Sequence, residues 1–150
     1  MSILIEHSKG KNVTYVIDTE KKTVKAMLRT DKCEPEKAFQ KAFLRAATQS
    51  GVVSVRPLDF FDPTFEIGCR YVGIARCHEN DHDKFDIEFG KKLALARAKK
   101  KHNNAYASML NSMTCFVEAF AEELNDRCND IWSKRQSAAD EEQTLLEQTP

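Results

Sequence analysis

The sequence predicts an α+β fold: a small antiparallel β-sheet covered by one helix, followed by a long C-terminal helix or helical hairpin that mediates oligomerisation. Two observations predict it. The first thirty residues alternate apolar and polar side chains with a period of two, which is typical of half-buried strands. Residues 34–49 and 86–131 carry apolar side chains mostly in steps of three and four, which is typical of amphipathic helices.

Three strands are expected first, at Ile3 to Ile5, Val13 to Ile17 and Val24 to Leu28. The connections at 8–12 and 18–21 have hairpin length and turn-type residues, so the strands should form an antiparallel meander. Such a sheet has one apolar face that must be buried, so another element has to pack against it.

The helix expected at 34–49 begins with Pro35 in its first turn and ends before Gly51. Five of its residues form one apolar face, predicted to cover the sheet: Ala38, Phe39, Ala42, Phe43 and Ala46.

Two further strands are expected at 52–55 and 70–77, because both segments are rich in β-branched residues. The loop between them holds Phe60, Phe61 and Phe65. These rings either plug the end of the sheet or a subunit interface, or form a stacking wall for a planar ligand.

The last helix would be about 70 Å long if it ran unbroken for its roughly 45–50 residues. A domain of this size cannot cover such a length. The helix therefore either breaks near His102-Asn103-Asn104 and folds back, or buries its apolar stripe against another subunit. The expected organisation is a sheet with one covering helix at 1–84, a helical oligomerisation region of the same domain at 85–136, and a flexible tail at 137–150.

The composition favours a cytoplasmic protein without membrane contact. The 150 residues are 41% hydrophobic, and no apolar run approaches the ~18 residues of a membrane span. Glu6 interrupts the first apolar run before a signal-peptide core could form. Five cysteines without a Cys-x-x-Cys pair are typical of a reducing compartment. A chain of this size can build a core unaided, so we expect no cofactor.

Charge is unevenly distributed, although 23 basic side chains balance 23 acidic ones. Six bases and no acid lie between Lys91 and His102, whereas nine acids and three bases lie between Glu118 and Glu147. The basic segment could receive nucleic acid, a nucleotide phosphate, or the acidic end of a neighbouring chain. Zero net charge makes nucleic acid the less favoured partner.

Candidate metal ligands gather in one neighbourhood: Cys69, Cys77, His78, Asp81, His82 and Asp83. Their residue types suit zinc, but adjacent Cys77 and His78 point apart in an extended chain, so a polar turn that caps the next helix is favoured and no metal site is expected.

Catalysis finds little support in the sequence. Adjacent residues on a strand point to opposite sides, which argues against Cys77 and His78 as a nucleophile and base. The sequence also lacks a Gly-rich phosphate loop and a Gly-x-Ser-x-Gly motif. We therefore expect no enzyme and no catalytic residue.

One stretch carries a family resemblance. The segment 72–78 leads through Phe85-Asp86 and Gly90 to Leu93-Ala94 and Arg97-Ala98. It resembles a motif of small bacteriophage and prophage proteins, in which a strand ending in Cys precedes Phe-Asp-x-x-x-Gly-x-x-Leu-Ala-x-x-Arg-Ala. The sheet-then-helix layout is also similar to the Thoeris anti-defence sponges, which are oligomers that capture cyclic nucleotide signals.

This resemblance implies a non-enzymatic phage-type protein in the host cytoplasm that counters antiviral defence, most sharply by sequestering a cyclic nucleotide signal. The alternative is a module that docks on a host defence or replication enzyme, or on nucleic acid. Basic, aromatic and amide side chains suited to phosphates and a base are the expected ligand-binding set: Arg70, Tyr71, Arg76, Phe85, Arg97, Lys100, Asn103 and Asn104.

Overall fold

The computed structural model describes residues 3–8, 10, 12–51, 65–77 and 85–148. The chain divides into two compact units, Met1–Asn111 and Ser112–Pro150, each described by itself. The elements in chain order are β1 (Ile3–His7), β2 (Val13–Asp18), β3 (Thr23–Arg29), α1 (Glu34–Gln49), β4 (Arg70–Arg76) and α2 (Ile87–Glu147).

The four strands form one antiparallel sheet in the order β1-β2-β3-β4. The predicted α+β class, the meander and the strand at 70–77 are therefore confirmed. The strand predicted at 52–55 and the loop residues Phe60 and Phe61 lie outside the described residues.

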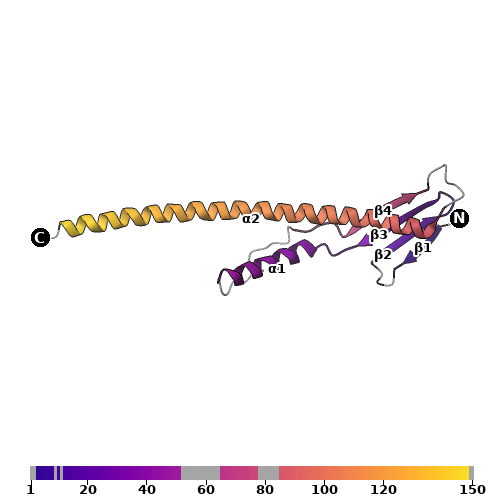
Figure 1. Cartoon of the computed structure of the whole chain (residues 1–150), viewed down its shortest axis with the longest axis horizontal. Helices are drawn as coiled ribbons and strands as arrows, with labels where there is room; N and C mark the ends of the chain where they lie inside the picture. Colours follow the sequence, from indigo (N-terminus) through magenta and orange to yellow (C-terminus); the bar gives the residue numbers. More distant parts are fainter. Residues whose placement is uncertain (1–2, 9, 11, 52–64, 78–84, 149–150) are drawn as a thin grey trace. The chain divides into compact units, whose positions relative to one another are not determined.

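The core lies between one face of the sheet and the first turns of α2 (Figure 1). We call this sheet face the covered face. Its buried residues pack with two alanines of α2, and the set is Val13, Ile17, Val24, Ala26, Leu28, Ala75, Ala94 and Ala98. Two glycines permit the close approach: a Cβ on Gly73 would overlap the Ala94 carbonyl oxygen, and one on Gly90 would lie 2.8 Å from Val24 Cγ2. Small residues four apart on α2 thus allow it to lie directly on the sheet.

The helix that covers the sheet is therefore α2, and the prediction that the 34–49 helix does so was wrong. The predicted helix forms, but Pro35 is its one buried residue, and Ala42 and Ala46 are exposed. Its Phe39 instead stacks on Phe65, with ring centroids 5.6 Å apart. The close approach at Gly73 requires small side chains on the covering helix, which α2 provides at Ala94 and Ala98.

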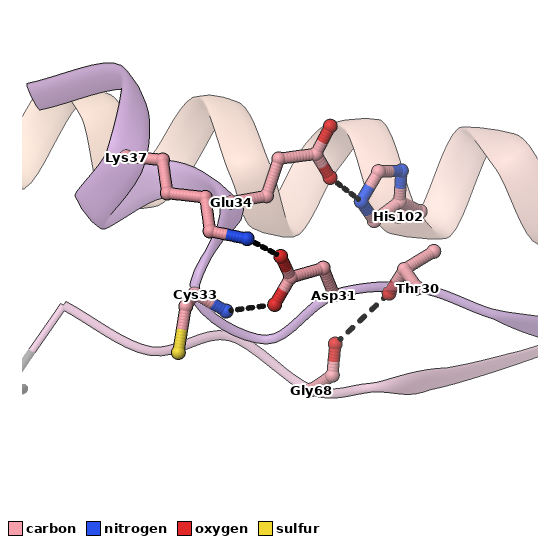
Figure 2. Close-up of polar contacts among 7 residues, drawn as sticks. All are labelled: Thr30, Asp31, Cys33, Glu34, Lys37, Gly68 and His102. Atoms are coloured by element: carbon pink, nitrogen blue, oxygen red, sulfur yellow. Dashed lines mark hydrogen bonds and ion pairs between the residues drawn. The ribbon is translucent and has the colours of Figure 1, made fainter. Parts of the chain in front are cut away.

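The start of α1 is held by polar contacts on both sides (Figure 2). The Asp31 carboxylate accepts a hydrogen bond from the Cys33 amide at 2.9 Å and pairs with the Lys37 ammonium. The hydrogen bond from Lys37 lowers the pKa of Asp31. Across from them, Glu34 Oε2 lies 3.3 Å from His102 Nε2 of α2. The contact between Glu34 and His102 connects α1 to the part of α2 that belongs to the same unit.

Helix α2 is continuous from Ile87 to Glu147. The break considered at His102-Asn103-Asn104 does not occur, so the helical hairpin is excluded. Residues 137–147, which the sequence placed in a tail, are helical as well. Among the described residues, no helix is long and apolar enough to cross a membrane.

Two basic side chains of α2 bind the outer edge of β4. The Thr30 amide bonds the Cys69 carbonyl, so the odd-numbered residues of β4 bond β3 and the carbonyls of Val72 and Ile74 face outward. Lys101 Nζ donates to Val72 O at 2.7 Å, and Arg97 Nη1 donates to Ile74 O at 2.6 Å. The two cations block an edge that another strand could otherwise pair with.

Replacing Arg97 and Lys101 together by alanine should expose this edge. We expect β4 amides to exchange faster with deuterium, and stability to fall by about 1 kcal/mol for each lost hydrogen bond. Hydrogen-exchange mass spectrometry and urea denaturation measure both effects. Lys100→Ala, on the same turn, is the matched control and should change neither. Unaltered exchange in the double variant would show that the two contacts do not protect the edge of β4.

Candidate ligand-binding face

The face of the sheet that α2 leaves uncovered is the candidate site, and we call it the open face. Because strand side chains alternate between faces, the register assigns its members. Aliphatic side chains occupy its middle and basic ones its ends: Ile3, Ile5, His7, Thr14, Val16, Asp18, Thr23, Lys25, Met27, Arg29, Arg70, Val72, Ile74 and Arg76. Ile3 and Ile5 are 51% and 63% exposed, which is unusual for isoleucine on a sheet.

Two arginines stand directly opposite each other on this face. Arg29 on β3 is the register partner of Arg70 on β4. The Arg29 amide donates to the Asn12 carbonyl, away from β4, so the two arginines form a non-hydrogen-bonded pair. In such pairs the Cα atoms are only about 4.5 Å apart, and like charges destabilise the sheet. Among the described residues, neither arginine has an ion-pair partner.

A hollow of about 450 Å³ lies beside this pair. It is lined by His7, Asn12, Thr14, Met27, Leu28, Arg29 and Arg70. His7 Nδ1 lies 3.1 Å from Thr14 Oγ1, which orients the imidazole. Guanidinium groups bind phosphate or carboxylate oxygens in bidentate fashion, and Met27 offers an adaptable apolar contact. We call this feature the arginine hollow; its donors suit an anion that carries an apolar or planar part.

A second hollow of about 480 Å³ lies at the other end of the open face. Its lining includes Lys25 and Arg76, together with Ile3, Val16, Asp18, Lys21, Thr23 and Ile74. The Asp18 carboxylate there accepts the amides of Glu20 and Lys21 at 3.1 and 3.0 Å. Arg76 is six residues from Arg70 along β4, a distance of about 20 Å. The two arginines of β4 therefore line separate hollows.

The predicted ligand-binding residues do not come together. Arg70 and Arg76 lie at opposite ends of the open face. Arg97 binds the edge of β4, and three exposed residues lie on the surface of α2, namely Lys100, Asn103 and Asn104.

Both predicted aromatic residues lie away from the open face. Tyr71 is on the covered face, its ring 5.2 Å from that of His102. Burial raises the pKa of the Tyr71 phenol, and the Gly68 backbone opposes this in part. Phe85 packs partly buried against the core. These two rings support the fold and do not flank either hollow.

The residues that sequence reasoning missed are His7, Asn12 and Arg29. A signal for Arg29 was present, because the alternation of 23–29 places it with Lys25 and Met27 on the polar side of its strand. Its pairing with Arg70 could not be predicted from the sequence, since the pairing depends on which strand lies next to β3.

The metal-ligand prediction concerned residues mostly outside the described part of the chain, including His78 and His82. Among the residues that the structure describes, no three His, Cys, Asp or Glu side chains form a metal-binding group.

Comparisons with known proteins add no relative. No protein family model matches the chain, and no match was found among curated proteins or among solved structures. The fold and the open face therefore define only a class, an α+β protein with a basic and aliphatic sheet surface that α2 does not cover. The similarity to phage sponges stays a prediction.

Proposed function

We propose that the chain is a non-enzymatic binding protein that holds a phosphate-bearing, nucleotide-type ligand in the arginine hollow. The observation that carries the proposal is the pair Arg29 and Arg70. Two facing guanidinium groups disfavour folding, and an anion between them would relieve the repulsion. His7 and Asn12 add polar groups at the same place.

The ligand class follows from the rest of the lining. A volume near 450 Å³ lies within the range of small-molecule sites. Met27 supplies apolar surface for a base, while the arginines take the phosphate. In the proposed role, the chain sequesters a cyclic nucleotide immune signal and so counters host defence. The motif around Gly90 and Arg97 supports this role by its resemblance to phage proteins. Sequestration requires affinity alone and no chemical step.

The test begins with protein purified from cells that make the candidate signals. Denaturation should release a small molecule that mass spectrometry identifies as a nucleotide. Titration calorimetry and thermal denaturation with cyclic dinucleotides, cyclic trinucleotides and cyclic ADP-ribose isomers should give one ligand of micromolar affinity or better. Such a ligand at 100 times its Kd adds about 2.7 kcal/mol of stability. No released nucleotide, together with no thermal shift across the panel, would contradict the proposal.

A second candidate function is binding of a single nucleic-acid strand along the open face. It is favoured by the 20 Å separation of Arg70 and Arg76, with aliphatic rows between them. Fluorescence polarisation with oligonucleotides of three and ten residues separates the candidates. Strand binding predicts that only the longer oligonucleotide binds well, with strong salt dependence, and that Arg76→Ala weakens it as much as Arg70→Ala. Nucleotide binding predicts an effect of Arg70→Ala alone.

A further inference from the structure

Five apolar residues of α2 in the unit Ser112–Pro150 follow one another at intervals of seven: Val117, Leu124, Ile131, Ala138 and Leu145. A seven-residue repeat keeps side chains along one side of a helix and is the signature of coiled-coil pairing. Val117, Leu124 and Ile131 are 44%, 51% and 62% exposed. We call this row the heptad row. The described part of this unit is a single helix, so no second element of the unit covers the row.

The residues that complete the seam decide how a partner could pair with it. The positions three residues after each member of the heptad row are Phe120, Arg127, Lys134 and Glu141. In a parallel, in-register pair, each of these side chains faces its own copy. Three successive layers would then hold two arginines, two lysines and two glutamates, and like charges in a seam repel strongly. A parallel pair is therefore disfavoured.

An antiparallel pair of two copies removes all three repulsive layers. In one register, Leu124 faces Lys134 of the second copy, Ile131 faces its Arg127, and Val117 faces its Glu141. Aliphatic surface then packs against the methylene stems of the charged residues while their heads reach water.

Two further features of this register favour the antiparallel pair. Large Phe120 faces small Ala138, which conserves volume across the seam. Two of the three charged side chains are already ion-paired on their own helix: Arg127 Nε lies 3.2 Å from Glu123 Oε1, and Lys134 Nζ lies 3.3 Å from Asp130 Oδ2.

We infer that the heptad row binds the heptad row of a second copy in this antiparallel register. The pair has a two-fold axis, so the same residues on both helices form the contact. On one flank of the seam, the axis passes between the two Cys128 residues, which therefore face each other. Cys128 is exposed in the single chain.

Self-association is tested by sedimentation velocity of the full chain. We expect a dimer at micromolar concentration, and Leu124→Asp with Ile131→Asp should weaken it at least tenfold. The matched control carries Asn129→Asp and Ser133→Asp, which add the same charge outside the seam and should leave the dimer intact. A monomeric native chain at 100 µM would overturn the inference.

Orientation is tested with a variant in which Cys128 is the sole cysteine, the other four being replaced by serine. Mild oxidation with copper-phenanthroline should give a covalent dimer within minutes. Moving the cysteine to position 133, with Ser133→Cys and Cys128→Ser, should abolish the crosslink. A dimer that fails to crosslink through Cys128 would overturn the antiparallel register. Because neither readout involves a nucleotide, the result is independent of the proposed ligand.

Discussion

Gly73→Ala is expected to displace α2 from the sheet and to destabilise the unit Met1–Asn111 by about 3 kcal/mol or more. A Cβ at this position would overlap the Ala94 carbonyl oxygen and lie 2.6 Å from the Ala98 backbone nitrogen. Both atoms belong to a helix backbone, which cannot move aside as a flexible side chain can. The strand and the helix must separate, and the contacts of Ala94 and Ala98 with the sheet are lost.

Hydrogen-exchange mass spectrometry is the suitable measurement, because α2 dominates the helical circular dichroism signal and the one tryptophan, Trp132, lies in the other unit. Amides of β3 and β4 should lose most of their protection. Gly68→Ala is the control, since the atoms nearest to a Cβ there belong to the Tyr71 side chain, at 3.4 Å or more. Native-like protection of β4 in Gly73→Ala would mean that α2 does not lie against this strand in solution.

The sequence predicted the strands well because each strand encodes its own alternation. Val13, Tyr15 and Ile17 face the covered side as their spacing indicates, and the same holds for β3. The covering helix was misassigned because large apolar side chains were taken to indicate the helix face that packs on the sheet. Phe39 and Phe43 in α1 suggested a core face, whereas the helix that covers the sheet makes its closest contacts through Gly90, Ala94 and Ala98.

Helix α2 exceeded its predicted end, and its asparagines did not break it. Asn103 and Asn104 each cost well under 1 kcal/mol in helix propensity, which the surrounding helix formers outweigh. Residues 137–147 are rich in alanine, glutamate, glutamine and leucine, all strong helix formers, so a prediction based on propensity would have extended the helix.

The candidate site was predicted only in part, because it depends on register. Arg70 was expected to bind phosphate, and the structure places it beside Arg29, 41 residues earlier in the chain. No local pattern brings these residues together; the pairing of β3 with β4 does. Tyr71 was assigned to the same site as Arg70, yet neighbours on a strand face opposite sides.

Arg70→Glu is expected to make the protein more stable while abolishing ligand binding. In the native chain, Arg70 and Arg29 repel each other across a non-hydrogen-bonded pair. A glutamate at position 70 would replace repulsion by attraction, which should raise the free energy of unfolding by about 1 kcal/mol. The same change removes a guanidinium from the arginine hollow and adds an anion to it. Loss of a charge-assisted hydrogen bond, worth about 1.5–3 kcal/mol, together with the new repulsion, should weaken binding about 100-fold.

Urea denaturation, and titration with the nucleotide that mass spectrometry identifies after release from the native chain, measure the two effects on one protein. Arg76→Glu is the matched control, because Arg76 stands directly opposite Thr23 and not opposite a basic residue, and because Arg76 does not line the arginine hollow. A purely structural role for Arg70 predicts that stability and binding fall together. A gain in the free energy of unfolding together with a loss of affinity would show that the facing arginines bind an anion and that their repulsion destabilises the fold. If Arg70→Glu binds the nucleotide as tightly as the native chain, the arginine hollow is not its site.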